Sequence, residues 1–356
     1  MELGNDIITN EQLDLGLLVC SKLLSPVFQL FAIFANILNL ATFHKIGSKD
    51  GVNVTFLALS LSDLAYVLLD ALNTVCLLIA TSPWQPSLPV SMYSITGCVI
   101  PYQYIFLETS TSLETYLAVT RCCCVALPLK FKNVFTFRRS LAVLVIIFIC
   151  NVAFRIPLLT TFGLTWQTSS VTNITRLTFY STDTYVIFSR LEQLVGKTCF
   201  PVLFLLIAAV CSVILSTCLL TMSLKRKSMT MPVTSYDKVA LQNLNTKMAM
   251  DMSSSNSSRT MKTKEVQLVK AVTLVTMLQG VLLLILSIYS LAEATIPEFF
   301  PTRKYRNSHN LILVVIYLLI TMHAGGKTFV YYKFNSKFRE SVKKTFNECL
   351  VLSKSS

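Results

Sequence analysis

Seven long apolar stretches constrain this chain more than any other feature. Each is about 20 residues or longer, the length that a helix needs to cross a lipid bilayer. Composition agrees, because charged residues make up 14% of the chain, against roughly 25% in soluble domains. We therefore expect an all-α membrane protein with one seven-helix transmembrane domain, residues 24–332. Its helices are predicted near residues 24–44, 53–80, 94–120, 140–162, 198–223, 271–292 and 310–332.

The basic residues predict the orientation of these helices. Seven spans place the two termini on opposite sides of the membrane. With a cytoplasmic C-terminus, the inner segments hold 22 of the Lys and Arg residues and the outer segments hold 7. The positive-inside rule then makes residues 1–23 an extracellular tail and residues 333–356 cytoplasmic. The net charge of +13 is explained by acidic membrane lipids at the cytoplasmic face, and no nucleic-acid partner is needed.

Two sites of covalent modification follow from this orientation. Asn173 belongs to an Asn-Ile-Thr sequon in an outer segment and is a candidate for glycosylation. Cys349, near the C-terminus, is a candidate for palmitoylation, with an unmodified thiol as the alternative.

The chain changes character after Tyr332, where basic and aromatic residues begin to alternate. A spacing of four predicts a helix with one apolar face and a basic surface elsewhere. Such a short amphipathic eighth helix is expected to lie in the membrane interface, with its aromatic rings buried in lipid. The apolar positions are Phe334, Phe338, Val342, Phe346 and Leu350.

Charged residues inside the expected spans are the strongest functional signal that the residues give unaided. They are costly in lipid, so they should face the interior, form pairs or line a cavity. Those in the outer halves, together with polar neighbours, form a candidate ligand pocket. The alternative is a buried polar network that only specifies helix packing. The candidate pocket residues are Asp70, Gln103, Tyr104, Glu108, Arg155 and Tyr289.

No pattern in the sequence favours an enzyme, a metal site or a cofactor. The three histidines have no metal-ligand spacing, and no phosphate-binding loop or nucleophile elbow is present. The three cysteines at 122–124 point about 100° apart on a helix, so they do not chelate one ion. An ion channel or a transporter that uses the intramembrane charges remains a rival, although the paired broken helices and internal repeat typical of transporters are absent from the sequence.

Several short segments resemble one receptor family when they are taken in order. The relevant segments are FANILNL in the first span, NVTFLALSLSDLAY in the second, AVTRCCCVALPLKF at the end of the third, KEVQLVKAV opening the sixth and FVYYKFNSKFR closing the seventh. Together they resemble rhodopsin-like G-protein-coupled receptors. The opening of the sixth and the end of the seventh are most similar to orphan chemosensory receptors of invertebrates such as molluscs.

The resemblance implies a plasma-membrane receptor that passes an extracellular small-molecule or peptide signal to a heterotrimeric G protein. A neuropeptide receptor of the same family is the alternative to a chemosensory one. The chain departs from the family pattern at several positions. Thr120 stands where an acid usually precedes Arg121, and Lys327-Thr328 stands where Asn-Pro usually precedes the tyrosine of the seventh helix.

The resemblance also assigns roles to residues. Arg121 is expected to act as the switch for G-protein coupling with Thr120, Glu265 and Tyr331, whereas an arginine that merely reaches the membrane interface is the alternative. The family normally bonds the cysteine at the position of Cys98 to the second outer loop, but residues 163–197 contain no cysteine. Cys20 and Cys76 are the possible partners, and a free thiol is the alternative. The intramembrane polar core is expected to contain Asn36, Asp63, Ser110, Glu114, His323 and Lys327.

Within this core, Asp63 and Lys327 are predicted to form an ion pair between the second and seventh helices. The family usually has an asparagine at the position of Lys327, so an ammonium group tethered there is expected to neutralise the buried acid. Lys327 lies about 8 Å from the inner end of its helix. The alternative is therefore that its side chain extends to the membrane surface.

Overall fold

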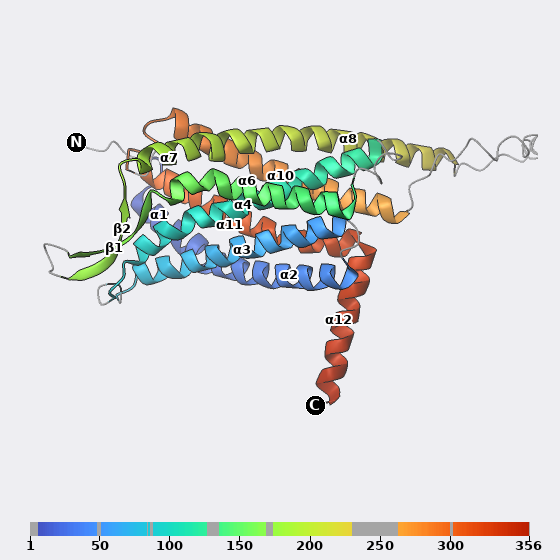
Figure 1. Ribbon diagram of the computed structural model, residues 1–356, viewed down its shortest axis with the longest axis horizontal. Coiled ribbons are helices and arrows are strands. Elements are labelled where there is room, and N and C mark those ends of the chain that lie inside the picture. The colour runs from blue at the N-terminus through green and yellow to red at the C-terminus, as the bar shows by residue number, and fades with distance from the viewer. Residues whose placement is uncertain are drawn as a thin grey trace, which may run out of the picture.

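The computed structural model describes residues 6–47, 51–83, 85, 88–126, 135–168, 174–229, 263–299 and 302–355. Its long helices run side by side along the long axis of the molecule (Figure 1). Each of the seven predicted stretches overlaps one of these helices. They are α2 (Ser25–Ile46), α3 (Gly51–Ala80), α4 (Met92–Ala126), α6 (Phe137–Leu159), α8 (Phe200–Met229), α10 (Thr263–Thr295) and α11 (Arg306–Phe334).

Within these described ranges, six helices are long and apolar enough to cross a membrane, whereas the sequence predicted seven apolar spans. The chain is therefore a multi-pass membrane protein. The predicted span that is missing from these six is α4, which packs against α3, α6, α8 and α10. Its polar side chains Gln103, Glu108 and Glu114 are buried. Because a helix enclosed by its neighbours presents little surface to lipid, it does not need an apolar sequence.

The segment between α6 and α8 was expected to be an outer loop, but its described residues form regular secondary structure. An antiparallel hairpin joins β1 (Phe162–Thr168) to β2 (Thr175–Ser181), with Phe162 opposite Ser181 and Thr168 opposite Thr175. Both strands are rich in threonine and in aromatic or aliphatic residues, a composition that favours strands. The hairpin lies at one end of the bundle, near α7, and α12 lies at the opposite end (Figure 1).

A second correction concerns the N-terminal tail, which is helical from Asn10. α1 (Asn10–Leu17) and the π-helical η1 (Leu18–Leu24) run directly into α2. Thr9 and Gln12 form a capping box at the start, in which each side chain accepts a hydrogen bond from the other residue's backbone N–H. The predicted extracellular tail is therefore in large part an extension of the first long helix.

Asp6, just before α1, caps the start of α11. Its Oδ2 accepts hydrogen bonds from the backbone N–H of Asn307 at 2.7 Å and of Ser308 at 3.3 Å. Its Oδ1 accepts a hydrogen bond from Ser308 Oγ at 2.6 Å. The first N–H groups of a helix have no partner within the helix, and the residue preceding α11, Tyr305, supplies no side-chain cap. The N-terminal segment thus provides the missing cap.

Replacing Asp6 with alanine should lower the free energy of unfolding by about 1 kcal/mol, the typical value of a helix cap. Burial acts to raise the pKa of Asp6, but hydrogen bonds from Ser308 and Asn307 outweigh it, and the pKa lies below the ordinary value of 3.8. The stabilisation is therefore complete above pH 3.8 and is lost as the pH falls through the lowered pKa. Thermal melts of the purified protein across this range should show the wild type and Asp6→Ala converging in acid.

The matched control for this prediction is Asp14→Ala, which removes an exposed acid from α1. It should leave the melting temperature unchanged at every pH. A loss of stability in Asp14→Ala equal to that in Asp6→Ala would contradict the capping role.

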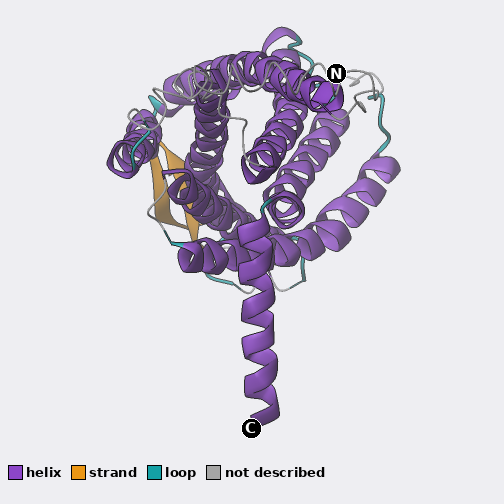
Figure 2. Ribbon diagram, turned by 90° about the vertical axis from the view of Figure 1, so that its right-hand side faces the viewer, coloured by secondary structure: helices purple, strands orange, loops and turns teal. Residues whose placement is uncertain are grey.

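At the opposite end of the bundle, α12 (Ser336–Ser355) turns away from the bundle axis (Figures 1 and 2). Four aromatic rings hold it there. The ring of Phe338 lies 5.1 Å from Phe43 of α2 and 5.9 Å from Tyr331 of α11, measured between centroids. The ring of Phe56, from α3, lies 4.9 Å from Tyr331. We call Phe43, Phe56, Tyr331 and Phe338 the aromatic cluster.

This packing changes the interpretation of the apolar stripe. Phe338 is 0% exposed, so its ring is covered by protein and not by lipid. The basic residues Lys337, Lys343 and Lys344 are exposed, and a location of α12 in the membrane interface stays a prediction. The side chains of Phe346 and of the palmitoylation candidate Cys349 lie outside the described residues.

Phe338→Leu should reduce stability by about 1 kcal/mol. Leucine keeps most of the apolar surface but loses the aromatic pairing, worth roughly 0.5–1.5 kcal/mol. The control is Phe34→Leu, because Phe34 on α2 is 62% exposed on the outside of the bundle. Melting temperatures in one detergent would compare the two variants. Equal melting temperatures would mean that α12 is not held by the cluster.

Candidate functional site

A buried group of charged side chains links α3, α4 and α11. Lys327 Nζ lies 2.8 Å from Asp63 Oδ2 and also contacts the carboxylate of Glu114. Ser110 Oγ donates a hydrogen bond to Asp63 Oδ1 at 2.5 Å. The predicted pair of Asp63 and Lys327 is therefore confirmed. Because Lys327 is 3% exposed, the alternative of an ammonium group reaching the membrane surface is wrong.

His323 extends this ionic cluster, which we define as Asp63, Ser110, Glu114, His323 and Lys327. Its Nε2 lies 3.2 and 3.1 Å from the two carboxylate oxygens of Glu114. The cluster thus contains two carboxylates, one ammonium and one imidazole. The sequence placed all five residues in the polar core but did not identify the contact between Glu114 and Lys327.

The sixth residue of the predicted polar core lies apart from this cluster. Asn36 Nδ2 donates hydrogen bonds to the backbone carbonyls of Ala32 at 2.9 Å and of Ala324 at 3.4 Å. It therefore links α2 to the backbone of α11.

Asp70 and Gln103, both predicted to line a ligand pocket, belong instead to a packing network. Asp70 Oδ1 accepts a hydrogen bond from Gln103 Nε2 at 3.0 Å. Its Oδ2 accepts hydrogen bonds from Gln29 at 2.7 Å and from Thr321 at 3.0 Å. Both acceptor atoms are thus used by the protein itself, and the helices α2, α3, α4 and α11 are joined. For these two residues the alternative of a buried network is correct.

Arg155 was also predicted to line the pocket, but it lies behind the pocket wall. The side chain is 0% exposed and bridges two acids. One guanidinium nitrogen contacts the carboxylate of Glu108, and Nη1 lies 2.5 Å from Glu192 Oε1. Glu192 belongs to η3 (Glu192–Cys199), a π-helical segment that follows α7 (Tyr185–Leu191) and continues into α8. The sequence missed Glu192 because residues 163–197 were interpreted as a loop.

Gly196 allows η3 to approach this ion pair. A Cβ atom at this position would lie 3.1 Å from Glu108 Oε1 and 3.6 Å from Arg155 Nη2. Both atoms belong to side chains that are already fixed by their pairing. A glycine here therefore allows close contact between η3, α4 and α6, where a larger residue would press on the side chain of Glu108.

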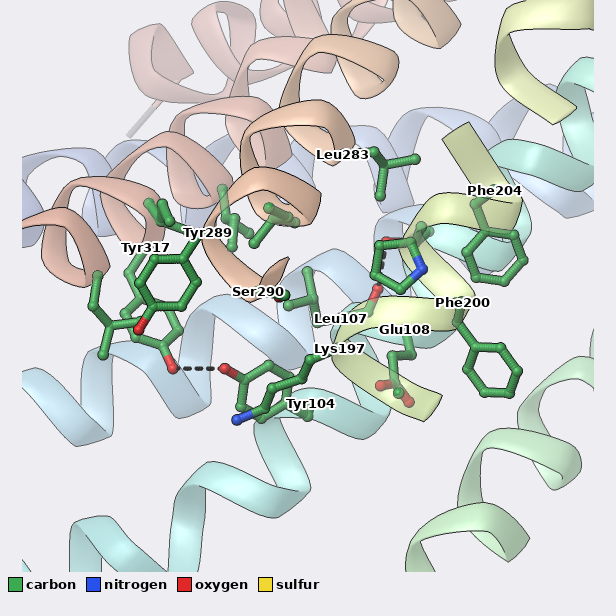
Figure 3. A pocket seen from close by; sticks show the side chains of 17 residues that line it. Tyr104, Leu107, Glu108, Lys197, Phe200, Phe204, Leu283, Tyr289, Ser290 and Tyr317 are labelled. Carbon is green, nitrogen blue, oxygen red and sulfur yellow. Dashed lines mark hydrogen bonds between the residues drawn. The ribbon is translucent and has the colours of Figure 1, made fainter. Parts of the chain in front are cut away.

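A cavity of about 60 Å³ lies between α4, η3, α8, α10 and α11. Small-molecule sites commonly lie between the helices of a bundle. Of the six predicted pocket residues, Tyr104, Glu108 and Tyr289 line it (Figure 3). Most of the remaining wall is apolar, including Leu107, Phe200, Pro201, Phe204, Leu283, Leu286, Leu313, Ile316 and Ile320.

Tyr317 and Lys197 are polar residues of this cavity that the sequence interpretation missed. Tyr317 of α11 places its hydroxyl 3.0 Å from that of Tyr104. Lys197 of η3 lies with its Nζ 4.7 Å from the centroid of the Tyr104 ring, a cation–π contact. A lysine immediately before an apolar run was a usable signal, but it was assigned to the loop. The candidate site thus combines an apolar wall with a few convergent polar groups.

The opposite end of α4 carries the residues expected to couple to a G protein. Arg121 is 7% exposed, so protein covers it. The alternative of an arginine in the membrane interface is therefore not supported. Thr120 Oγ1 donates a hydrogen bond to the carbonyl of Leu117, one turn earlier on its own helix, at 2.8 Å. Tyr331 belongs to the aromatic cluster at the same end, and the side chain of Glu265 lies outside the described residues.

The candidate disulfide is not formed. Cys20, Cys76 and Cys98 are all free thiols. A disulfide requires Cβ atoms about 3.5–4.5 Å apart. No two of these three thiols are bonded to each other in the structure. Asn173, the glycosylation candidate, lies outside the described residues.

Comparison with known proteins adds no family to this description: no protein-family model and no curated protein matches the chain.

Proposed function

We propose that this chain is a G-protein-coupled receptor of the plasma membrane, in which α4 spans the membrane in addition to the six apolar helices. It binds an extracellular chemical ligand in the cavity near Tyr104 and activates a heterotrimeric G protein at the end that carries Arg121. A chemosensory role is the specific form of this proposal, and a neuropeptide ligand is the alternative. Its N-terminus is extracellular and its C-terminus cytoplasmic.

The arrangement of α4 carries the proposal. This single helix contributes Tyr104 and Glu108 to the cavity, Glu114 to the ionic cluster and Arg121 to the opposite end. Tyr104 and Arg121 are separated by about 26 Å along the helix axis. A ligand that shifts α4 against α10 or α11 would therefore change the surroundings of Arg121. Such a two-state rearrangement is what transmission across a membrane requires.

The test is ligand-stimulated nucleotide exchange. Cells that express the chain with a promiscuous G protein are screened with one library of small molecules and one of peptides, and the responding library separates the two ligand classes. Arg121→Ala should reach the cell surface and lose the response, while Arg138→Ala, an exposed arginine of α6, should respond normally. A normal response in Arg121→Ala would overturn the assigned role. A ligand-gated current in the absence of any G protein would favour a channel instead.

A further inference from the structure

The ligand cavity has a polar neighbour on its η3 side. A second cavity, of about 140 Å³, lies between α7, η3 and α10, and Arg190, Gln193 and Glu293 contribute to its wall. Lys197 and Ser290 line both cavities. We call this second cavity the polar chamber. A single elongated molecule in contact with Lys197 would therefore reach both spaces.

The polar chamber carries two cations, Lys197 and Arg190, to which the described part of the chain binds no acid. Among the described residues, neither Lys197 nor Arg190 forms an ion pair. The one acid of the chamber wall, Glu293, accepts a hydrogen bond from Gln193 Nε2 at 2.7 Å and lies 3.7 Å from His309 Nε2. The chamber thus offers an ammonium and a guanidinium to a ligand that carries negative charge.

The ligand cavity, which we also call the deeper cavity, favours an apolar group over an anionic one. Apart from Glu108, Lys197 and a few hydroxyl groups, apolar side chains form its wall. Glu108 is 8% exposed and is held by Arg155. In Figure 3 the amino group of Lys197 points toward Tyr104 and away from the carboxylate of Glu108. An anionic group placed deep in the cavity would meet the buried carboxylate, so the negative charge of a ligand belongs at Lys197.

We infer that the ligand is an anionic amphiphile, with its charged head group bound by Lys197 in the polar chamber and its apolar body in the deeper cavity. The inference rests on the proposed function only for the effect of binding, not for binding itself. A free carboxylate and the head group of an anionic membrane lipid share the required chemistry.

Direct binding to the purified chain tests this inference without a G protein. The chain is placed in nanodiscs of phosphatidylcholine, and the saturable binding of octanoate, dodecanoate and hexadecanoate is measured. Dodecanol and dodecylammonium, with the same chain as dodecanoate, serve as neutral and cationic controls. We expect at least one carboxylate to bind, and the matched alcohol and amine to bind at least about tenfold more weakly, because they lose the charge-assisted hydrogen bond.

Lys197→Gln should weaken carboxylate binding by at least about tenfold. Lys304→Gln is the matched control, because Lys304 also lies over a tyrosine ring, 5.3 Å from the centroid of Tyr305, but in an exposed loop. It should bind like the wild type. Adding phosphatidylglycerol to the nanodiscs distinguishes a free carboxylate from a lipid head group as the natural ligand. Displacement of the carboxylate, absent in Lys197→Gln, would assign the site to a lipid head group, and no displacement would assign it to a free acid.

Three results would overturn the inference: no saturable binding of any carboxylate, equal binding of dodecanol, or unchanged binding in Lys197→Gln. Failure of the proposed function gives a different pattern. Carboxylate binding that depends on Lys197, without nucleotide exchange, would remove the receptor role and leave the ligand class intact. Nucleotide exchange driven by a neutral or cationic ligand, without any need for Lys197, would support the receptor role and overturn the inferred ligand class.

Discussion

Replacing Lys327 with methionine should destabilise the protein by about 3–5 kcal/mol, the usual cost of removing one partner from a buried ion pair. The change leaves the carboxylates of Asp63 and Glu114 buried without an ammonium group, and only His323 remains to offset them. Because folded domains are typically stable by only 5–15 kcal/mol, surface expression should fall sharply. Surface labelling in cells and thermal melts of the purified protein would measure the effect.

Lys333→Met is the matched control, since Lys333 lies on the same helix but is exposed. It should change stability by less than about 0.5 kcal/mol. Adding Asp63→Asn to Lys327→Met should restore much of the lost expression, because one carboxylate then remains, paired with His323. Losses that simply add in the double variant would show that Asp63 and Lys327 are not coupled.

The same geometry predicts a milder phenotype for Asp63→Asn alone. Lys327 would still contact Glu114, so the ammonium group is not left unpaired. The pair predicted from the sequence, with Asp63 as the single partner of Lys327, would instead leave the ammonium group unpaired in this variant. The order of stability should therefore be wild type, then Asp63→Asn, then Lys327→Met.

Arg155→Met should be destabilising to a similar extent, about 3–5 kcal/mol. It removes the one guanidinium that bridges Glu108 and Glu192, and with it the link between α4, α6 and η3. Arg155→Lys should recover little, because a single ammonium lacks the planar fork that reaches two carboxylates at once. Melting temperatures of the three proteins in one detergent would provide the comparison.

Arg138→Met, at the exposed end of the same helix, should melt like the wild type. A fully stable Arg155→Lys would indicate that charge alone matters at this position and that the bridging geometry does not.

Helix positions were predictable because apolar length is a local property of the sequence. The contact between Asp63 and Lys327 was predictable as well, since an unpaired charge near the membrane midplane is costly and few partners exist. The participation of Glu114 was not, because it depends on the rotation of α4 about its own axis. No pattern within α4 fixes that rotation independently of its four neighbouring helices.

The ligand cavity was only partly predictable for a related reason. Asp70, Tyr104 and Arg155 all lie in the outer halves of their helices, and depth was the only criterion that the sequence offered. Their packing differs in the structure. Asp70 accepts hydrogen bonds from neighbouring side chains, and Arg155 forms ion pairs with two acids. Of the three, Tyr104 lines the cavity. Lys197 was missed because a charged, Gly-containing segment before an apolar run was taken for a loop, although it is π-helical.

The π-helical turn in η3 makes the spatial relation between Lys197 and the aromatic wall depend on chain length. A π-helical segment holds an extra residue relative to an α-helix, and each residue of an α-helix turns the chain by about 100°. Deleting one residue between Lys197 and Phe200 would let this segment return to α-helical winding and would change the direction in which Lys197 projects relative to Phe200 and Phe204. A homologue one residue shorter here would therefore require a differently composed cavity.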